Sequence, residues 1–383
     1  MSEATKQIVT QHSPLHETHV RLGATMRECD NWFVPASYND VLFEYAAVRE
    51  RGAGVIDLSS RGRFRVSGSE AVSFLNGLIT NDMKTLTENR WMPAAFPNVQ
   101  GRLIASVRVV RLPDDTTGKT VPVFLIDTEA ATHKRVLNAI QRFTLAGDFH
   151  VDDLTSQVAL MSVQGKKAVE IIGSLLGQAP SGLPANGVVQ VEWQQETLTV
   201  LRATHTAEDG FDLIVSANNA PALWKALVDA GGCPVGHDAL EMLRIEAGVP
   251  RYGLDMDENN VVTEVLDEAV SYTKGCYVGQ EIIARIKYRG HVAKKLTGVM
   301  FERLVKLESG AAIKFKDDKE VGRITSAVSS PHLGRSVALA FVKYDSSAPG
   351  TEVSVSADRT EPAVVTEPPF VRGSWYSLPN MNA

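Results

Sequence analysis

The sequence predicts an α+β fold with a C-terminal antiparallel β-barrel, and three observations lead to this prediction. Most of the chain alternates between short apolar runs of strand length and amphipathic stretches of helical period. Glycine, proline and asparagine mark the boundaries between these runs. Beyond about residue 292, short stretches of alternating apolar residues follow one another without a helix between them, which is typical of a small antiparallel barrel.

The first predicted elements are a helix and two strands. Apolar residues recur at near-helical spacing over 38–51, and the glycines that follow stop this helix. Residues 55–58 and 63–66 have the length and composition of strands, and a second helix begins at 67–70.

A strand followed by a helix recurs at 158–163 and 165–176. The two halves are therefore candidates for a diverged duplication, although they share a pattern and not residue identity. Further elements are predicted as strands at 188–200 and as helices at 220–230 and 238–247, with Gly248 ending the last helix.

The C-terminal part divides into a barrel and a tail. Barrel strands are predicted at 296–301, 312–315, 321–326, 337–342 and 351–355. The proline-containing end has no periodicity. The predicted divisions are a region of two intertwined α+β subdomains over 30–290, a barrel domain over 291–358 and an irregular tail over 359–383.

Composition excludes several classes of protein. The 383 residues exceed one ordinary domain, and 44% hydrophobic with 22% charged residues is usual for a soluble globular chain. No apolar run reaches the length of a membrane span, and the polar N-terminus has no secretory signal, so the default expectation is a cytoplasmic protein without a membrane partner. A net charge of −6 argues against nucleic acid as a partner. The three cysteines form no C-x-x-C pair, so no metal or cluster ligand set is predicted.

One of these cysteines, Cys276, stands in the segment Lys274 to Glu281, which reads K-G-C-Y-V-G-Q-E. The glycines on both sides indicate that its thiol is exposed, and the basic residues that follow favour the ionised thiolate form. The alternative is a cysteine packed as a small hydrophobe beside a turn. The basic segment is itself open to two interpretations, a solvated face or a collar for an anionic ligand that includes Lys287 and Arg289.

This octapeptide resembles the signature of the YgfZ family, folate-binding relatives of the glycine-cleavage T protein (aminomethyltransferase). The resemblance to the T-protein superfamily extends over roughly 37–355 and implies three subdomains around a central folate channel. It also implies tetrahydrofolate as the cofactor, Cys276 as the functional cysteine, and iron-sulfur proteins or their assembly machinery as partners.

Two further segments are similar to the superfamily. Glu208 and Asp209 stand in A-E-D-G-F-D, which by itself reads as an Asp-Gly turn. It is similar to the T-protein pattern G-E-D-G-[aromatic]-E, and the resemblance implies that Glu208 accepts hydrogen bonds from the pterin. In the loop after 238–247, Arg251 and Tyr252 are candidates to face the folate channel; the alternative, which we prefer for Arg251, is a structural pair with Asp255 or Glu258.

A fourth segment, Asn98 to Arg102, departs from the T-protein pattern. Asn98 is a candidate folate ligand or a turn residue. T proteins carry N-x-x-G-G followed by two apolar residues and two aspartates, and one aspartate assists the attack of folate on the aminomethyl group. Here Ala105 and Ser106 occupy the aspartate positions. The N-V-Q-G-R form fits YgfZ-like proteins instead.

The preferred hypothesis is a tetrahydrofolate-binding protein that supports iron-sulfur cluster assembly or repair through one-carbon or thiol chemistry at Cys276. Glu208 holds the pterin in this hypothesis, and Lys287 and Arg289 collect the glutamate tail. The first alternative is a folate-dependent aminomethyltransferase or demethylase, against which the missing aspartates count. The second alternative is a non-enzymatic scaffold that senses folate.

Overall fold

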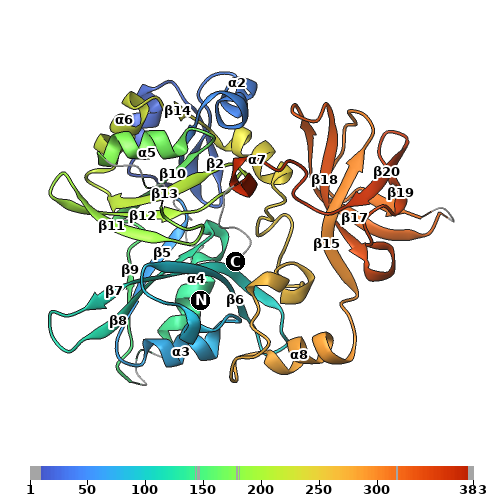
Figure 1. Cartoon of the computed structure of the whole chain (residues 1–383). Coiled ribbons are helices and arrows are strands. Elements are labelled where there is room, and N and C mark those ends of the chain that lie inside the picture. Colours follow the sequence, from blue (N-terminus) through green and yellow to red (C-terminus); the bar gives the residue numbers. More distant parts are fainter. Residues whose placement is uncertain are drawn as a thin grey trace, which may run out of the picture.

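The protein consists of three parts: two parts built on sheets lie one above the other, and a barrel lies to their right in Figure 1. The computed structural model describes residues 10–377 except for 143, 145–146, 178–179, 181 and 316–317. One part is built on a five-stranded sheet, another on a six-stranded sheet, and the third is a closed barrel. The prediction of an α+β fold that ends in an antiparallel barrel is confirmed.

The five-stranded sheet has the order β6-β7-β8-β5-β9 and two helices, α3 and α4. It contains the predicted strand at 63–66 and the helix predicted to begin at 67–70. Its elements are β5 (Gly62–Ser67), α3 (Ala71–Leu78), β6 (Arg90–Pro97), β7 (Leu103–Asp115), β8 (Val121–Thr128), α4 (His133–Gln141) and β9 (His150–Asp153).

The six-stranded sheet has the order β11-β12-β13-β10-β4-β14. Its elements are β4 (Gly54–Asp57), β10 (Val158–Gln164), α5 (Ala168–Leu176), β11 (Val188–Trp193), β12 (Glu196–Arg202), β13 (Gly210–Ser216), α6 (Ala220–Asp229) and β14 (Cys233–Pro234). The strands and helices predicted at these places are present.

The two sheets have the same connectivity. Apart from short 3-10 turns, the chain runs β5-α3-β6-β7-β8-α4-β9 in one and β10-α5-β11-β12-β13-α6-β14 in the other. In both sheets the last of the three consecutive strands lies beside the first strand of the unit. They differ at one edge, where β9 pairs directly with β5, whereas β4 lies between β10 and β14. This shared topology supports the duplication hypothesis.

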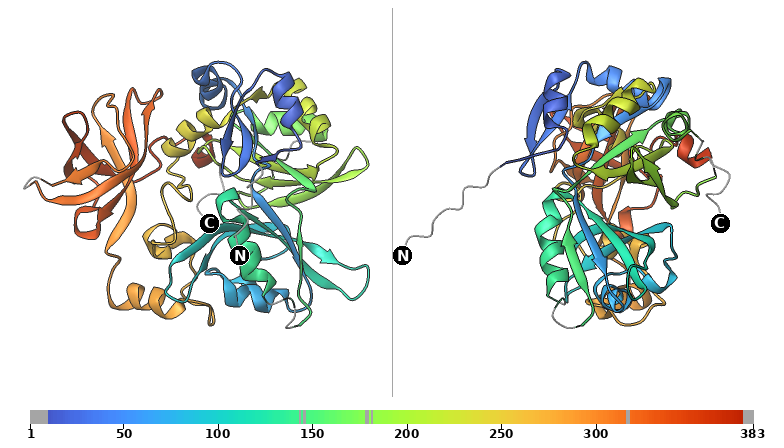
Figure 2. Two further views of the ribbon diagram at one scale, coloured as in Figure 1. Left: turned by 180° about the vertical axis from the view of Figure 1, so that it is seen from behind. Right: turned by 90° about the vertical axis from the view of Figure 1, so that its left-hand side faces the viewer.

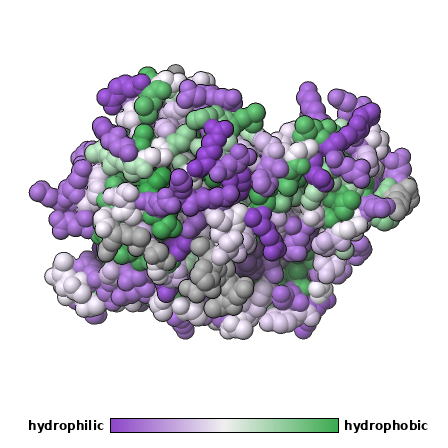
Figure 3. All heavy atoms as spheres, turned by 45° about the horizontal axis from the view of Figure 1, so that its top comes forward, coloured by the Kyte–Doolittle hydropathy of each residue, from purple (hydrophilic) through white to green (hydrophobic). Residues whose placement is uncertain are grey.

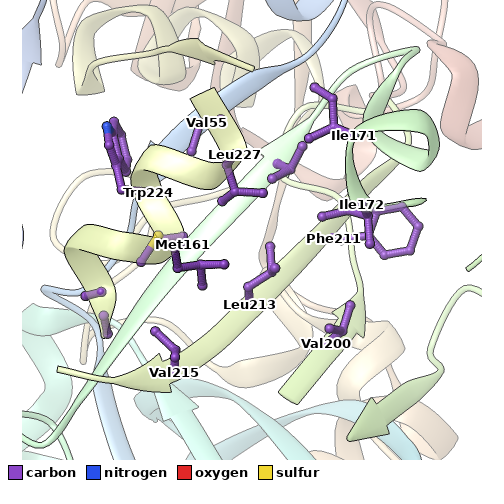
Figure 4. Close-up of a cluster of buried hydrophobic side chains, with 14 of the residues drawn as sticks. Val55, Met161, Ile171, Ile172, Val200, Phe211, Leu213, Val215, Trp224 and Leu227 are labelled. Atoms are coloured by element: carbon purple, nitrogen blue, oxygen red, sulfur yellow. The ribbon is translucent and has the colours of Figure 1, made fainter. Parts of the chain in front are cut away.

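A buried apolar cluster joins the six-stranded sheet to its helices (Figure 4). Phe211 and Leu213 project from β13, Ile172 comes from α5, and Trp224 and Leu227 come from α6. All five side chains are buried. Burial of a large apolar side chain contributes about 1.5–3 kcal/mol, so this cluster fixes the two helices on the sheet.

The N-terminal segment forms a small sheet of order β1-β3-β2 with one short helix. These elements are β1 (Gln11–His12), α1 (His16–Arg21), β2 (Thr25–Cys29) and β3 (Trp32–Ser37). His19 and Ser13 both contact the carboxylate of Asp57 at the end of β4, at 2.9 Å and 2.5 Å. The segment is thereby attached to the six-stranded sheet.

The helix predicted over 38–51 is present in two pieces. It begins at Asp40, whose Oδ1 accepts a hydrogen bond from the backbone N of Leu42 at 2.8 Å, as an N-cap residue does. The piece α2 (Val41–Ala46) continues as a π-helical turn (Ala47–Arg51), and Gly52 ends it.

Helix α7 (His237–Glu246) connects the two-sheet part to the barrel. Gly248 ends it as predicted, with a left-handed φ of +75° and a hydrogen bond from its N to the O of Ile245. Arg244 donates to Ser326 Oγ of the barrel at 2.9 Å, so one buried side chain spans the junction. Figure 2 shows the barrel and the two-sheet part from behind and from the side.

The barrel closes in the order β15-β18-β17-β16-β19-β20. Its strands are β15 (Lys294–Phe301), β16 (Ala312–Lys314), β17 (Glu320–Ser330), β18 (Arg335–Lys343), β19 (Glu352–Ser356) and β20 (Thr360–Thr366). The five predicted strands are all present. Figure 3 shows an indentation between the barrel, on the right, and the rest of the molecule, with polar side chains beside it.

The prediction that 359–383 is irregular is wrong for β20. Glu361, Ala363 and Val365 point inward, while Pro362 and Val364 are exposed, which is the alternation of a half-buried strand. Proline and a buried carboxylate concealed this pattern in the sequence.

After β20 the chain crosses back to α7, where the N atoms of Phe370 and Val371 donate to the O of Glu246. Residues 378–383, which belong to the predicted tail, lie outside the described residues. Within the described part of the chain, no helix has the length and apolar character needed to cross a membrane.

Candidate functional site

A cavity of about 300 Å³ lies where the two large sheets, the N-terminal sheet and α7 meet. Leu58, Trp91, Val107 and Leu240 supply apolar walls. Charged side chains from several strand ends and from α7 reach the same space. A concave site with apolar walls and a few convergent polar groups is the usual form of a small-molecule site.

Asp127, near the end of β8, is the central buried acid of the cavity wall. Its two oxygens accept from Arg61 Nε and Nη2 at 2.8 Å and 3.1 Å, and Arg108 Nη2 lies 3.0 Å from Oδ2. Burial alone would raise the pKa of Asp127, but the two guanidinium groups hold it below its usual range. Asp127 is therefore an ionised acid with both oxygens engaged.

Arg108 also connects the two sheets. It projects from β7, and its Nη1 lies 2.7 Å from Asp212 of β13 in the other sheet. Both oxygens of Asp212 also lie 3.0 Å from His205 Nε2. Against the effect of burial, the charges of His205 and Arg108 lower the pKa of Asp212. A chain of charged contacts thus crosses the back of the cavity.

Helix α7 and the following loop supply a second charged group. Glu241 pairs with both Arg244 and Arg251, the latter at 3.2 Å. Arg251 Nη2 also donates to the sulfur of Cys29, a cavity residue, at 3.5 Å. Burial raises the pKa of the Cys29 thiol, so the cavity contains a protonated thiol that the sequence did not single out.

Glu129 follows β8 and is half-buried in the cavity wall. Its Oε2 accepts from the backbone N of Tyr252 at 3.0 Å. Burial raises the pKa of Glu129, although the positive charges of Arg61, Arg251 and Arg244 oppose that effect. Among the described residues, no donor hydrogen-bonds to its other oxygen, Oε1.

Glu208, the predicted pterin ligand, lies outside the cavity lining. It is 1% exposed, and its Oε1 accepts from Arg49 at 2.9 Å. Its Oε2 accepts from the N and Oγ of Ser374 at 2.8 Å and 2.6 Å. Both oxygens are engaged by the protein in this conformation, so its role in folate binding stays a prediction.

The segments around Asn98 and Cys276 lie against each other. Gly279 has φ +77°, and a Cβ there would stand 2.4 Å from the O of Asn98. The side chain of Asn98 caps its own turn, because Oδ1 accepts from the N atoms of Gln100 and Arg102 at 2.8 Å and 3.0 Å. Cys276 is exposed in the loop before α8 (Gln280–Arg289). Neither Asn98 nor Cys276 lines the cavity.

Lys274 anchors the cysteine loop. Its Nζ donates to the carbonyl oxygens of Asn76, Ile79 and Asn81 at 2.6–2.9 Å. Burial lowers the pKa of Lys274 to about 8, although the negative charge of Asp82 opposes that effect. This lysine therefore joins the cysteine loop to the C-terminal end of α3.

Arg251 lines the cavity and Tyr252 stands behind it. The structural pairing that we considered for Arg251 is present in part, since its backbone N donates to Asp255 at 3.1 Å. Its guanidinium pairs with Glu241 instead. The hydroxyl of Tyr252 contacts Arg135, which also holds Glu258, so the ring is part of the wall support.

Lys287 and Arg289 are exposed on α8 and do not line the cavity. Lys287 Nζ lies over the ring of Tyr272 at 4.5 Å and 3.8 Å from Asp267. Both side chains are exposed to solvent, and their role in holding an anionic ligand stays a prediction.

Sequence reasoning missed most of the charged cavity residues. Arg61, Asp127 and Glu129 are single polar residues beside strand ends, and no motif surrounds them. Their one signal was position, because functional residues collect where strands end. The motifs at Asn98 and Cys276, which sequence reasoning did single out, contain glycines that allow their two loops to pack closely together.

Family models cover almost the whole chain. The model described as "GCVT N-terminal domain" matches residues 15–274. The model described as "Glycine cleavage T-protein C-terminal barrel domain" matches residues 294–372, a range that includes β20.

Similar proteins match over nearly their full lengths. An aminomethyltransferase of Symbiobacterium thermophilum is 33% identical, over 97% of this chain and 99% of its own. An aminomethyltransferase of Thermotoga maritima is also 33% identical, over 95% and 98%. The crystal structure of glycine cleavage system aminomethyltransferase T from Bartonella henselae shares the fold, with TM-score 0.86, 22% identity and coverage of 95% of this chain and 98% of that one.

Proposed function

Because this chain belongs to the glycine-cleavage T-protein family, we propose that it transfers a one-carbon group to tetrahydrofolate. The observation that carries the proposal is the cavity between the two sheets, where charged side chains meet an apolar wall. Its relatives named aminomethyltransferase make an aminomethyl group the first donor to test. The first alternative from the sequence is thus better supported than the iron-sulfur hypothesis.

The cavity residues fit parts of a folate. A planar pterin requires apolar faces and hydrogen-bonding groups, and Trp91 and Leu240 stand beside Ser106 and His205. At about 300 Å³ the cavity accommodates a ring system, with the glutamate tail at its mouth. Arg251, which is about one-third exposed, is the cation we assign to that tail.

The chain's own residues hold this site in shape. Arg61 and Arg108 hold Asp127 in the cavity wall, and Arg108 also links the two sheets through Asp212. Bound tetrahydrofolate supplies the nitrogen that takes the carbon. Closely spaced donors and acceptors on rigid strands orient the reactants without a large rearrangement.

Calorimetry with tetrahydrofolate is the first test, followed by a panel of aminomethyl, N-methyl and S-methyl donors with folate products identified by mass spectrometry. We expect saturable binding and either methylene- or methyl-tetrahydrofolate as product. Arg251→Met should weaken binding about tenfold or more, as loss of a charge-assisted contact does. The matched control Arg289→Met removes the same charge from α8 and should bind as wild type.

The outcomes separate the hypotheses. No binding by wild type overturns the proposal, while binding without transfer from any donor favours the folate-sensing scaffold. If Arg289→Met weakens folate binding and Arg251→Met does not, the glutamate tail lies on α8. That result would support the interpretation of the basic segment as a collar for an anionic ligand.

A second candidate is the YgfZ-like role in supporting iron-sulfur proteins. Its specific support is the octapeptide with Cys276 exposed in a loop that Lys274 and Gly279 fix in place. In cells that lack the protein, Cys276→Ala should then fail to restore iron-sulfur enzyme activity while the purified variant still binds folate. Full restoration by Cys276→Ala would exclude this role for the thiol.

A further inference from the structure

Four carboxylates line the described cavity, and their contacts distinguish them. Asp127 has both oxygens bound by arginine, and Glu241 is held by Arg244 and Arg251. Asp30 is exposed at the rim beside Cys29. Glu129 remains, half-buried, with one oxygen fixed and the other without a donor.

The position of Glu129 is fixed by its surroundings. The hydrogen bond from the N of Tyr252 to Oε2 orients the carboxylate at a distance of 3.0 Å. Its Oε1 accepts from no donor among the described residues, and it is not completely shielded. It is therefore open toward the cavity that Glu129 lines. A carboxylate fixed through one oxygen and open at the other can exchange a proton with a bound molecule.

The strand register places Glu129 beside uncharged residues of β7, and the nearest acid along the chain, Asp127, is already paired with Arg61 and Arg108. Val107 of β7 pairs with Thr128 of β8 in antiparallel register. Continuing this register by one position brings Ser106 opposite Glu129, and both residues line the cavity. Ser106 and its neighbour Ala105 carry no charge. At this end of β7 and β8, Glu129 is the cavity acid with an oxygen that accepts from no donor among the described residues.

We propose that Glu129 is the catalytic proton acceptor of the one-carbon transfer, acting through Oε1. This inference rests on the proposed function. As the acceptor amine forms its bond to the donor carbon, the bond from that carbon to the leaving group breaks, and the electron pair stays on the leaving group. Glu129 takes the proton that the amine nitrogen loses, becomes a neutral acid and later returns the proton to solvent.

The environment of Glu129 suits this role. Burial raises the pKa of Glu129 above the ordinary glutamate value, which makes it a stronger base, while the charges of Arg61, Arg251 and Arg244 favour the ionised form. These three arginines and the N of Tyr252 are the groups that act on it from the neighbouring turn, loop and helix.

Glu129→Gln tests the role because glutamine keeps an oxygen for the N of Tyr252 but cannot take the proton. With the donor that gives product, kcat should fall about 100-fold or more, as loss of a general base does. Tetrahydrofolate affinity by calorimetry should change by less than about threefold, a difference below 1 kcal/mol. The wild-type rate should rise with pH through the pKa of Glu129, and the variant should lose that rise.

A titration that needs no turnover gives the second readout. In protein labelled with 13C at the glutamate carboxyl carbons, the signal absent from Glu129→Gln should titrate above the ordinary glutamate range. The control is Glu258→Gln, which removes an exposed carboxylate that also contacts Tyr252 and should leave rate and pH profile unchanged.

The failures are distinguishable. A Glu129→Gln variant that transfers at the wild-type rate, or a Glu129 signal that titrates in the ordinary range, overturns this inference and leaves the proposed function standing. Wild-type protein that binds no folate or transfers from no donor overturns both. A Glu129→Gln variant that unfolds at lower temperature is replaced by Glu129→Asp, for which a lowered rate with an unchanged folate affinity is expected, and a wild-type rate counts against the role.

Discussion

Single residues show why the most recognisable motif of this chain is not the lining of its cavity. Gly279 allows the cysteine loop to touch the turn at Asn98, because any Cβ at its left-handed φ would collide with a backbone oxygen. Gly101 of that turn also has a positive φ and packs against Ile283 of α8. The motif therefore specifies a contact between two loops, whatever chemistry Cys276 performs.

Gly279→Ala should lower the stability of the protein by about 1–2 kcal/mol or more, since a left-handed conformation costs an L-residue about that much before the collision with Asn98 is counted. Gly275→Ala is the matched control in the same octapeptide, because a Cβ there meets no atom within 4 Å. Urea unfolding of the two variants measures the difference. Equal midpoints would mean that the loop shifts without cost.

Sequence reasoning at this scale identified residues by motif, and the cavity is built from residues without one. Arg251 was found because it stands in a recognisable loop, whereas Asp127 lies near the end of an apolar strand and Glu129 follows that strand. Side chains from β2, β8 and α7 meet only in the folded chain, because these elements are far apart in the sequence. That proximity depends on the fold, so the spacing of these residues along the sequence does not reveal it.

Individual elements are fixed by local signals and joined by polar contacts. At the end of β4, Asp57 accepts from Ser13, Ser59 and His19, and it is 4% exposed. Although burial opposes ionisation, contacts from His19, Ser13 and Ser59 lower the pKa of Asp57 to about 2. The N-terminal segment is therefore held by an ionised acid.

The stability that Asp57 contributes should disappear in acid. Its pKa falls from 3.8 when unfolded to about 2 when folded, so the contribution, about 2 kcal/mol, is present above pH 4 and is lost as the pH falls toward 2. Urea unfolding of wild type and Asp57→Asn between pH 5 and 2.5 measures it. The difference in unfolding free energy should shrink below pH 4; a constant difference would contradict the prediction.

Most elements could be predicted from the sequence because their signals are local. The barrel strands show alternation, and Gly248 ends α7 as a glycine in left-handed conformation does. β20 was missed because Glu361 is buried there as an ion-paired acid, held by Arg303 and Arg359. A charged residue on the inner face breaks the apolar pattern that sequence reasoning depends on.

At the scale of the molecule, a buried ionic cluster joins the part built on the six-stranded sheet to α7 and the barrel. Arg49 from the turn after α2 pairs with Glu208 and with Glu246 at the end of α7. Ser330 of the barrel donates to Glu246 at 2.5 Å, and Ser374 of the returning chain donates to Glu208. The loop before β13 of the six-stranded sheet, helix α7 and the barrel are thus joined at one buried cluster.

Glu208→Ala should destabilise the protein by about 3 kcal/mol or more, because it leaves Arg49 buried with one of its two partners missing. Tetrahydrofolate affinity should stay unchanged, since Glu208 does not line the cavity. Thermal unfolding and calorimetry on the same samples measure both, with the exposed Glu192→Ala as control. Normal stability with lost folate binding would instead restore Glu208 as the pterin ligand.

The arrangement of the whole was the least predictable level. The sequence suggested a repeated strand and helix, but only the structure shows that β4 joins the second sheet and pairs with β14 far along the chain. Such long-range pairings depend on which edges remain free after the local units have formed. The resemblance to a known family supplied the three-part arrangement that periodicity did not.

The placement of β4 bears on how the chain folds as it leaves the ribosome. All strands of the five-stranded sheet come from the continuous stretch 62–153, so that sheet has every partner as soon as this stretch has emerged. β4 emerges before it, yet its partners β10 and β14 come afterwards. Its apolar residues Val55 and Ile56, both fully buried in the finished protein, have no sheet to join throughout that interval. Since synthesis proceeds from the N-terminus and unpaired apolar strands aggregate, we expect β4 to be a segment that a chaperone shields on the nascent chain.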